Sequence, residues 1–133
     1  MTNKDFFNKS EADNWFLRNK KALEEGGIDE EAVLLLCSWL QPFKSDIESV
    51  LEVGCGSGHI LNIVSNTLDA KGFGVEPSKK AVEYISESFP NLTAKVGWGD
   101  DIPLDRKFDL VHLGFFLYLV DRENFLRCVS EAD

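Results

Sequence analysis

The hydrophobic and polar positions of this chain follow a helical period as far as Pro42 and a mixed pattern after it. Apolar side chains at helical spacing predict an amphipathic helix through Trp15 and Phe16 and a second helix over residues 33–40. Residues 1–45 are therefore predicted to form a helical N-terminal extension.

Local signals mark the ends of these two helices. The Ser-Glu-Ala-Asp pattern that starts at Ser10 is typical of a capping box and predicts that the first helix begins there. Gly26-Gly27 is predicted to end that helix, Asp29 to cap the second helix, and Pro42 to end it.

Beyond Pro42, short apolar runs alternate with amphipathic segments. Strands alternating with helical crossovers pair in parallel, so residues 46–133 are predicted to form a doubly wound, mainly parallel α/β sheet of about four strands. The strands are predicted over residues 49–53, 72–75, 92–96 and 108–113. The helices are predicted over residues 59–68, from a cap at Ser78 to Pro90, and from Asp121 onward. Ligands of such sheets bind at the carboxyl ends of the strands.

The stretch SVLEVGCGSGHIL has glycine at Gly54, Gly56 and Gly58, between a predicted strand and a predicted helix. Such glycines either build only a sharp turn or let a ligand approach the backbone, and the strand–turn–helix context favours a ligand. A phosphate-binding loop needs a lysine, and none follows Gly58. The dinucleotide fingerprint has its third glycine where this chain has His59, which argues against NAD.

Glu76 ends the second predicted strand, at the same edge of the sheet as the glycine turn. A carboxylate there can accept hydrogen bonds from both ribose hydroxyls of an adenosine. The alternative is a solvated acid in a Glu-Pro-Ser turn that caps the next helix. The pairing with the glycine turn favours the ribose contact.

These motifs resemble those of class I S-adenosylmethionine-dependent methyltransferases, which have a Rossmann-like fold. VLEVGCGSG matches the family's first motif, GFGVEPS resembles its acidic partner, and FDLVHLGFFLYLVD resembles its fourth strand and following loop. The resemblance implies that Glu52 helps to hold the methionine end of S-adenosylmethionine and that Glu76 holds the ribose. The residues implied to bind this cofactor are Glu52, Gly54, Cys55, Gly56, Gly58, Glu76, Pro77, Trp98, Gly99, Asp100, Leu113 and Gly114.

The adenine contact has two open interpretations. The family often places an acid after the third strand to bind the adenine amino group. One alignment puts Trp98 at that position, where its ring would stack on adenine or wall it. The other puts Asp100 there as the acceptor. Core packing of Trp98 and a turn role for Asp100 are the structural alternatives.

The loop after the fourth predicted strand reads Leu113-Gly114-Phe115-Phe116. It differs from the Asn/Asp-Pro-Pro-aromatic turn that is common in methyltransferases of the amino nitrogens of bases or glutamine. A small-molecule acceptor, or methylation at an oxygen or carbon atom, is therefore expected.

A general base is needed only if the acceptor must lose a proton. Tyr118 lies where the family often has a histidine facing the acceptor, so it is the catalytic candidate. His112 is expected to be a core histidine, and His59 is expected to pack or to cap the helix that it begins.

The resemblance implies methyl transfer from S-adenosylmethionine. The alternatives are an NAD(P)-dependent oxidoreductase and a catalytically inactive cofactor-binding or scaffold module.

The helix with Trp15 and Phe16 is expected either to pack on the sheet or to form a lid, as extensions do in many family members. Family sheets have seven strands, so this sequence is expected to carry the N-terminal part of the fold only, ending at Asp133 before a fifth strand. An unpaired sheet edge beside the fourth strand would favour oligomers.

Charge and cysteine content narrow the partners. The chain has 14 basic and 23 acidic residues and a formal net charge of −9, which argues against nucleic acid as a partner. Its cysteines, Cys37, Cys55 and Cys128, have no CxxC spacing, so free thiols and no metal site are expected. No apolar run has the length of a membrane span, and a cytoplasmic protein is expected.

Overall fold

The computed structural model describes residues 2–24, 30–114 and 116–133. The predicted boundaries at Gly26, Gly27 and Asp29, and Phe115 of the predicted loop, lie outside these ranges.

A parallel sheet in the order β3-β2-β1-β4 forms the centre of the fold. Its strands are β1 (Ser49–Val53), β2 (Lys71–Glu76), β3 (Leu92–Val96) and β4 (Leu110–Leu113). The helices of this part of the chain are α4 (His59–Leu68), α5 (Lys79–Ser88) and α6 (Phe125–Ala132). The prediction of a doubly wound, parallel, Rossmann-like sheet is confirmed.

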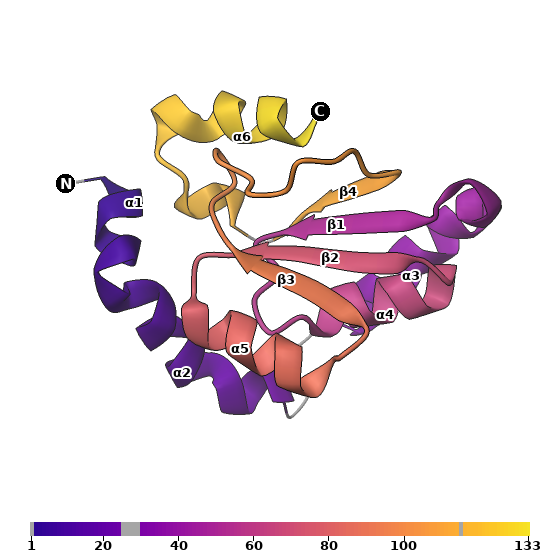
Figure 1. The fold of residues 1–133 in the computed structure, drawn as a ribbon, viewed down its shortest axis with the longest axis horizontal. Helices are drawn as coiled ribbons and strands as arrows, with labels where there is room; N and C mark the ends of the chain where they lie inside the picture. The colour runs from indigo at the N-terminus through magenta and orange to yellow at the C-terminus, as the bar shows by residue number, and fades with distance from the viewer. Residues whose placement is uncertain (1, 25–29, 115) are drawn as a thin grey trace.

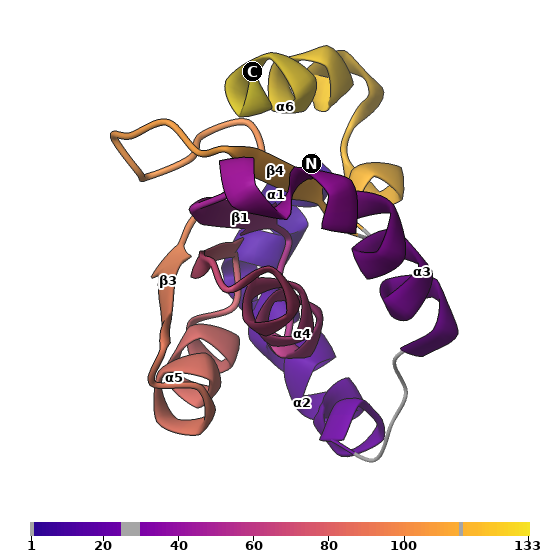
Figure 2. The same cartoon turned by 90° about the vertical axis from the view of Figure 1, so that its right-hand side faces the viewer.

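Both faces of the sheet are covered, which is why every residue of β1 is buried. Figures 1 and 2 show α4 and α5 on one side of the sheet and α6 on the other. Val50 belongs to the core on the α4 side, where Leu61 and Leu68 of α4 are almost fully buried. Leu51, the next residue, belongs to the core on the opposite side. The period of two along β1 thus separates two hydrophobic clusters.

The fourth strand begins at Leu110, later than predicted. The preceding residue, Asp109, accepts hydrogen bonds from the backbone N–H groups of Glu48 and Ser49 and from the Ser49 hydroxyl. This carboxylate therefore ties the beginning of β1 to the segment that leads into β4.

The N-terminal extension comprises two helical segments. The first contains α1 (Asn3–Phe6), a π-helical turn (Phe7–Glu11) and α2 (Ala12–Glu24). The second contains α3 (Glu30–Leu40) and a 3₁₀ turn (Gln41–Asp46). The prediction that the first helix begins at a Ser10 cap is wrong. The capping box is made by Thr2 and Asp5, and Ser10 has a φ of 114° at a kink within the helical segment.

The last helix also begins later than Asp121 predicts, because a 3₁₀ turn (Arg122–Asn124) precedes α6. Both carboxylate oxygens of Asp121 instead accept from the backbone N–H of Asn3. Figure 1 shows the result: α1 lies beyond the tips of β1 and β2, beside the carboxyl edge of the sheet.

Candidate functional site

The glycine turn follows β1 in a conformation that side chains disfavour. Gly54, Gly56 and Gly58 have φ angles of 74°, 53° and 79°, in the left-handed region. The backbone N–H groups of Gly54 and Cys55 both donate to the carbonyl of Val75, at 2.8 and 3.2 Å. The turn is therefore fastened to the end of β2.

Glu76 meets this turn at the end of β2. Its Oε2 accepts from the Gly56 N–H at 3.0 Å, and its Oε1 accepts from the Ser78 N–H at 3.1 Å. The pKa of Glu76 is raised to about 7, chiefly by burial and to a smaller extent by the charges of Glu52 and Asp13, whereas these two hydrogen bonds partly offset the rise. The strand tips that the sequence pairs thus lie in direct contact.

Glu52 is the second carboxylate at this edge, and only 2% of it is exposed. Its Oε1 lies 3.2 Å from Nδ1 of His112 on β4, whereas its Oε2 has no hydrogen-bond partner among the described residues. Burial raises the pKa of Glu52, and the hydrogen bond and charge of His112 partly offset that rise. Sequence reasoning missed this pairing, because the register that sets Glu52 opposite His112 follows from the pairing of β1 with β4.

The loop after β3 forms the next wall. Trp98 and Asp101 pair across a tight turn through their backbone groups. A Cβ added to Gly99 at the tip of this turn would lie 2.5 Å from a ring carbon of Phe116. Phe116 also packs against Gly54, where an added Cβ would lie 2.8 Å from its ring. One aromatic side chain thus lies against both the glycine turn and the β3 loop.

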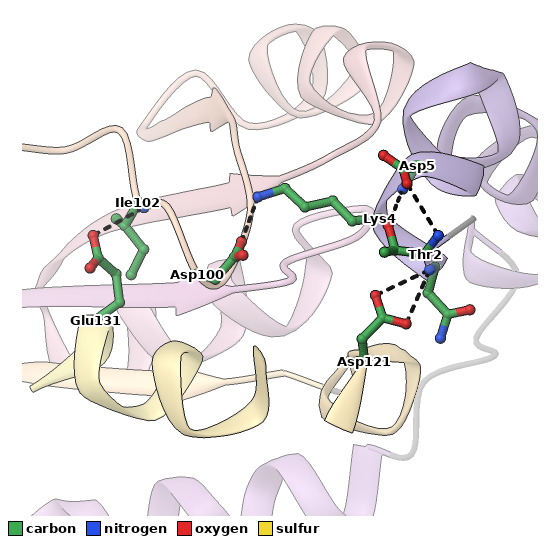
Figure 3. A network of polar contacts seen from close by, with 8 residues as sticks. Thr2, Lys4, Asp5, Asp100, Ile102, Asp121 and Glu131 are labelled. Atoms are coloured by element: carbon green, nitrogen blue, oxygen red, sulfur yellow. Dashed lines mark hydrogen bonds and ion pairs between the residues drawn. The ribbon is translucent and has the colours of Figure 1, made fainter. Parts of the chain in front are cut away.

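The N-terminal extension crosses this edge through polar contacts. Lys4 Nζ lies 2.8 Å from Oδ1 of Asp100, as Figure 3 shows, and 5.6 Å from the centre of the Trp98 ring. The Asn3 side chain donates to the carbonyl of Leu119 at 2.9 Å. Sequence reasoning found neither residue, because contacts between segments so far apart in the chain have no local signal.

These loops and the extension enclose a cavity of about 200 Å³. The predicted cofactor residues that line it are Glu52, Gly54, Cys55, Gly56, Glu76, Pro77, Trp98, Gly99 and Asp100. Tyr118 also lines it and is 74% exposed. Lys4 and Phe116, which the sequence did not indicate, are part of the lining as well.

Three predicted cofactor residues lie outside this lining. Gly58 packs against Ile85, which would lie 2.9 Å from an added Cβ. Gly114 donates to the Val53 carbonyl at 2.8 Å and leaves no room for a side chain beside Gly54. Leu113 packs in the hydrophobic cluster around Val53. Each of the three therefore has a structural role.

His59 packs and does not reach the cavity. Its ring lies 5.0 Å from that of Phe89, its Nδ1 lies 2.8 Å from the Ser57 hydroxyl, and burial lowers its pKa. The expectation that His59 packs is confirmed.

The cysteines, Cys37, Cys55 and Cys128, are free and buried. Within residues 2–24, 30–114 and 116–133, no cluster of three potential metal-binding side chains is present. No helix in the same ranges is long and apolar enough to span a bilayer.

Residues 50–133 match the family described as a methyltransferase domain. The chain belongs to this family. The prediction of a class I methyltransferase, a family whose cofactor is S-adenosylmethionine, is thereby confirmed at the level of the family. The orphaned Glu52 Oε2 and the side-chain-free glycine turn fit such a ligand, which carries an ammonium and a sulfonium but no phosphate.

Relatives and solved structures agree with the family. The chain is similar to a protein named as a methyltransferase, 235L of Invertebrate iridescent virus 6. The two are 31% identical over 85 residues, which are 62% of this chain and 32% of 235L. CalS10 from Micromonospora echinaspora has the same fold, with a TM-score of 0.72 at 17% identity, over 87% of this chain and 50% of that one. DesVI from Streptomyces venezuelae has a TM-score of 0.70 at 22% identity, over 86% of this chain and 49% of the DesVI chain. The chain therefore spans about half the length of these solved structures.

The contact between Gly99 and Phe116 predicts a coupled pair. Gly99→Ala is expected to lower the free energy of unfolding by about 1–3 kcal/mol, because the added methyl group displaces the Phe116 ring. In a Phe116→Leu background the loss should be smaller by about 0.5 kcal/mol or more. Urea unfolding of the wild-type protein, the two single variants and the double variant measures this coupling as a double-mutant cycle. Strictly additive losses of stability would contradict it.

Proposed function

We propose that this chain binds S-adenosylmethionine in the cavity at the carboxyl edge of its sheet and takes part in methyl transfer to a small-molecule acceptor. The observation that carries the proposal is the convergence of Glu52, Glu76 and the glycine turn on one cavity, with the Gly56 N–H bound to the Glu76 carboxylate at 3.0 Å.

Glu76 is the proposed ribose ligand. Two backbone N–H groups fix the orientation of its carboxylate, and each carboxylate oxygen retains a further lone pair for a ribose hydroxyl. The glycine turn beside it allows the sugar to approach the backbone without a clash. Glu52 is the proposed ligand of the methionine end, where its unpartnered oxygen suits the ammonium group.

The adenine is proposed to bind beside the β3 loop. Trp98 and Asp100 both line the cavity, so stacking of adenine on the Trp98 ring and a hydrogen bond from the adenine amino group to Asp100 are both proposed. Lys4 engages Oδ1 of Asp100 and lies near the Trp98 ring, so the two residues form one unit with the extension. Phe116 supplies an apolar floor beneath Gly54 and Gly99.

When bound, S-adenosylmethionine would supply a methyl group that its sulfonium activates for transfer to a lone pair of the acceptor. Residues of the chain then contribute mainly alignment and exclusion of water. Tyr118 is the candidate base for an acceptor that must lose a proton, because its exposed side chain lies at the rim of the cavity.

An acceptor of small size is supported by the enclosure of the site. The extension covers the cavity with Phe7 and Trp15, which leaves little room for a macromolecule at the carboxyl edge. CalS10, which shares the fold, is described as an amino pentose methyltransferase, and an acceptor of comparable size fits this proposal.

The N-terminal extension is proposed to act as a hinged lid. Its α2 segment is anchored, because Phe16 is buried and Asp13 accepts from the Ser78 hydroxyl and the Lys80 N–H. Its α1 segment contacts the cavity walls through polar groups, Lys4 with Asp100 and Asn3 with Asp121 (Figure 3). The kink at Ser10 separates the anchored α2 segment, which contributes Trp15 to the cavity lining, from the α1 segment that contributes Lys4.

The ribose contact is tested by Glu76→Ala. The substitution is expected to weaken S-adenosylhomocysteine binding by about 1.5–3 kcal/mol, since it removes charge-assisted hydrogen bonds. Isothermal titration calorimetry measures the change, with Glu83→Ala on the exposed face of α5 as the charge-matched control. Equal affinities for the wild-type protein and Glu76→Ala would remove Glu76 from the site, and a wild-type protein that binds no S-adenosylhomocysteine would contradict the proposed function.

The raised pKa of Glu76 predicts a pH-dependent affinity. Ribose hydroxyls donate to the ionised carboxylate, so binding favours loss of the proton and lowers the pKa of the bound state below about 7. The affinity for S-adenosylhomocysteine should be highest above pH 7, where Glu76 is ionised. It should fall as the pH decreases through 7, by up to about tenfold per pH unit for one linked proton. Titrations with S-adenosylhomocysteine across this interval check the slope, which Glu76→Gln should flatten. A constant wild-type affinity would be incompatible with this linkage.

The lid predicts a kinetic effect of Lys4. Lys4→Met removes the ion pair with Asp100 and is expected to speed S-adenosylhomocysteine release by about fivefold, as for a pair worth about 1 kcal/mol. Stopped-flow tryptophan fluorescence measures the rate. Lys20→Met, which removes a pair with Glu24 on α2, is the control. Equal release rates from the wild-type protein and Lys4→Met would argue against the lid.

A further inference from the structure

Glu52 and His112 form a pair that the proposed function does not yet use. They occupy opposite positions in the register of β1 and β4, and in a parallel pair such residues project to the same face. His112 Nδ1 lies 3.2 Å from Glu52 Oε1. Both residues lie one position before the end of their strands, next to the glycine turn and to Gly114.

The two oxygens of Glu52 have different surroundings. His112 holds Oε1, whereas Oε2 is buried and has no hydrogen-bond partner among the described residues. An unpaired buried carboxylate oxygen is costly unless a ligand group satisfies it. Glu52 lines the cavity, so a ligand in the cavity is the available source of a donor.

His112 contacts the Glu52 carboxylate without lining the cavity. It is absent from the residues that line the cavity, and its side chain is 26% exposed. Its contact with the cavity therefore runs through the Glu52 side chain. The Leu61 backbone N–H, the Glu76 carboxylate and the Cys55 thiol also face Glu52, and none of them supplies a full positive charge.

We propose that His112 is a positioning residue that holds one oxygen of Glu52 so that the other oxygen is presented to the ammonium group at the methionine end of the cofactor. The inference rests on the proposed function, which places the methionine end at Glu52. It assigns a role to a histidine of β4 that the family's motifs, as they are matched in this chain, leave without one.

Two ligands separate this role from a merely structural one. S-adenosylhomocysteine carries the amino acid group, whereas 5′-methylthioadenosine has the same adenosine and lacks it. His112→Leu is expected to weaken S-adenosylhomocysteine binding by about tenfold or more, as for loss of a charge-assisted contact, and to leave 5′-methylthioadenosine binding within about twofold. His112→Asn should recover most of the loss, because its amide N–H can donate from nearly the same place.

Isothermal titration of both ligands to the full chain measures these affinities. Val111→Ala, on the opposite face of β4 and paired with Leu51, is the control for a general loosening of the strand. His112→Ser gives the same comparison if the leucine variant does not fold. Equal weakening of the two ligands, or no weakening of either, would overturn the positioning role while the proposed function stands. A wild-type protein that binds neither ligand would overturn both.

Discussion

The hydrogen bond from the Gly56 N–H to the Glu76 carboxylate joins the two strand tips on which the site depends. Gly56 forms this bond in a turn where its φ is positive, a conformation that a side chain disfavours. The neighbouring N–H groups of Gly54 and Cys55 donate to the Val75 carbonyl. A side chain at these glycines would strain the turn and separate the backbone from Glu76.

This arrangement has an electrostatic cost. Glu52 and Glu76 are both buried, and burial raises the pKa of each; the charge of Glu52 raises that of Glu76 further. Backbone N–H groups donate to both oxygens of Glu76, and His112 contacts one oxygen of Glu52, whereas Oε2 of Glu52 has no hydrogen-bond partner among the described residues. In the proposed function, the ammonium group of the ligand supplies the missing partner of Glu52. The site is therefore organised for binding at the expense of local stability.

Much of the fold could be predicted because its signals are local. The strands at 49–53 and 92–96 and the helix at 59–68 have the predicted bounds, since apolar runs and flanking glycine or proline define them. The cap by Ser78 was equally visible in the sequence and accepts from the Ala81 N–H as a cap should. The glycine turn and Glu76 were predicted to meet, and they do.

The remaining features depend on contacts between distant segments. Ser10 has the side chain of a helix cap, but the Thr2 capping box starts the helix earlier. Lys4 reaches Asp100 only because the extension lies across the carboxyl edge. His112 meets Glu52 only through the register of β4, which the sequence does not specify. A single sequence cannot show such pairings.

A crystal structure of the chain with S-adenosylhomocysteine tests the central claim most directly. The account predicts both ribose hydroxyls within hydrogen-bond distance of the Glu76 carboxylate, with the Gly56 N–H still donating to it and the amino acid group beside Glu52. Adenosine bound elsewhere, or a ribose without contact to Glu76, would contradict the account.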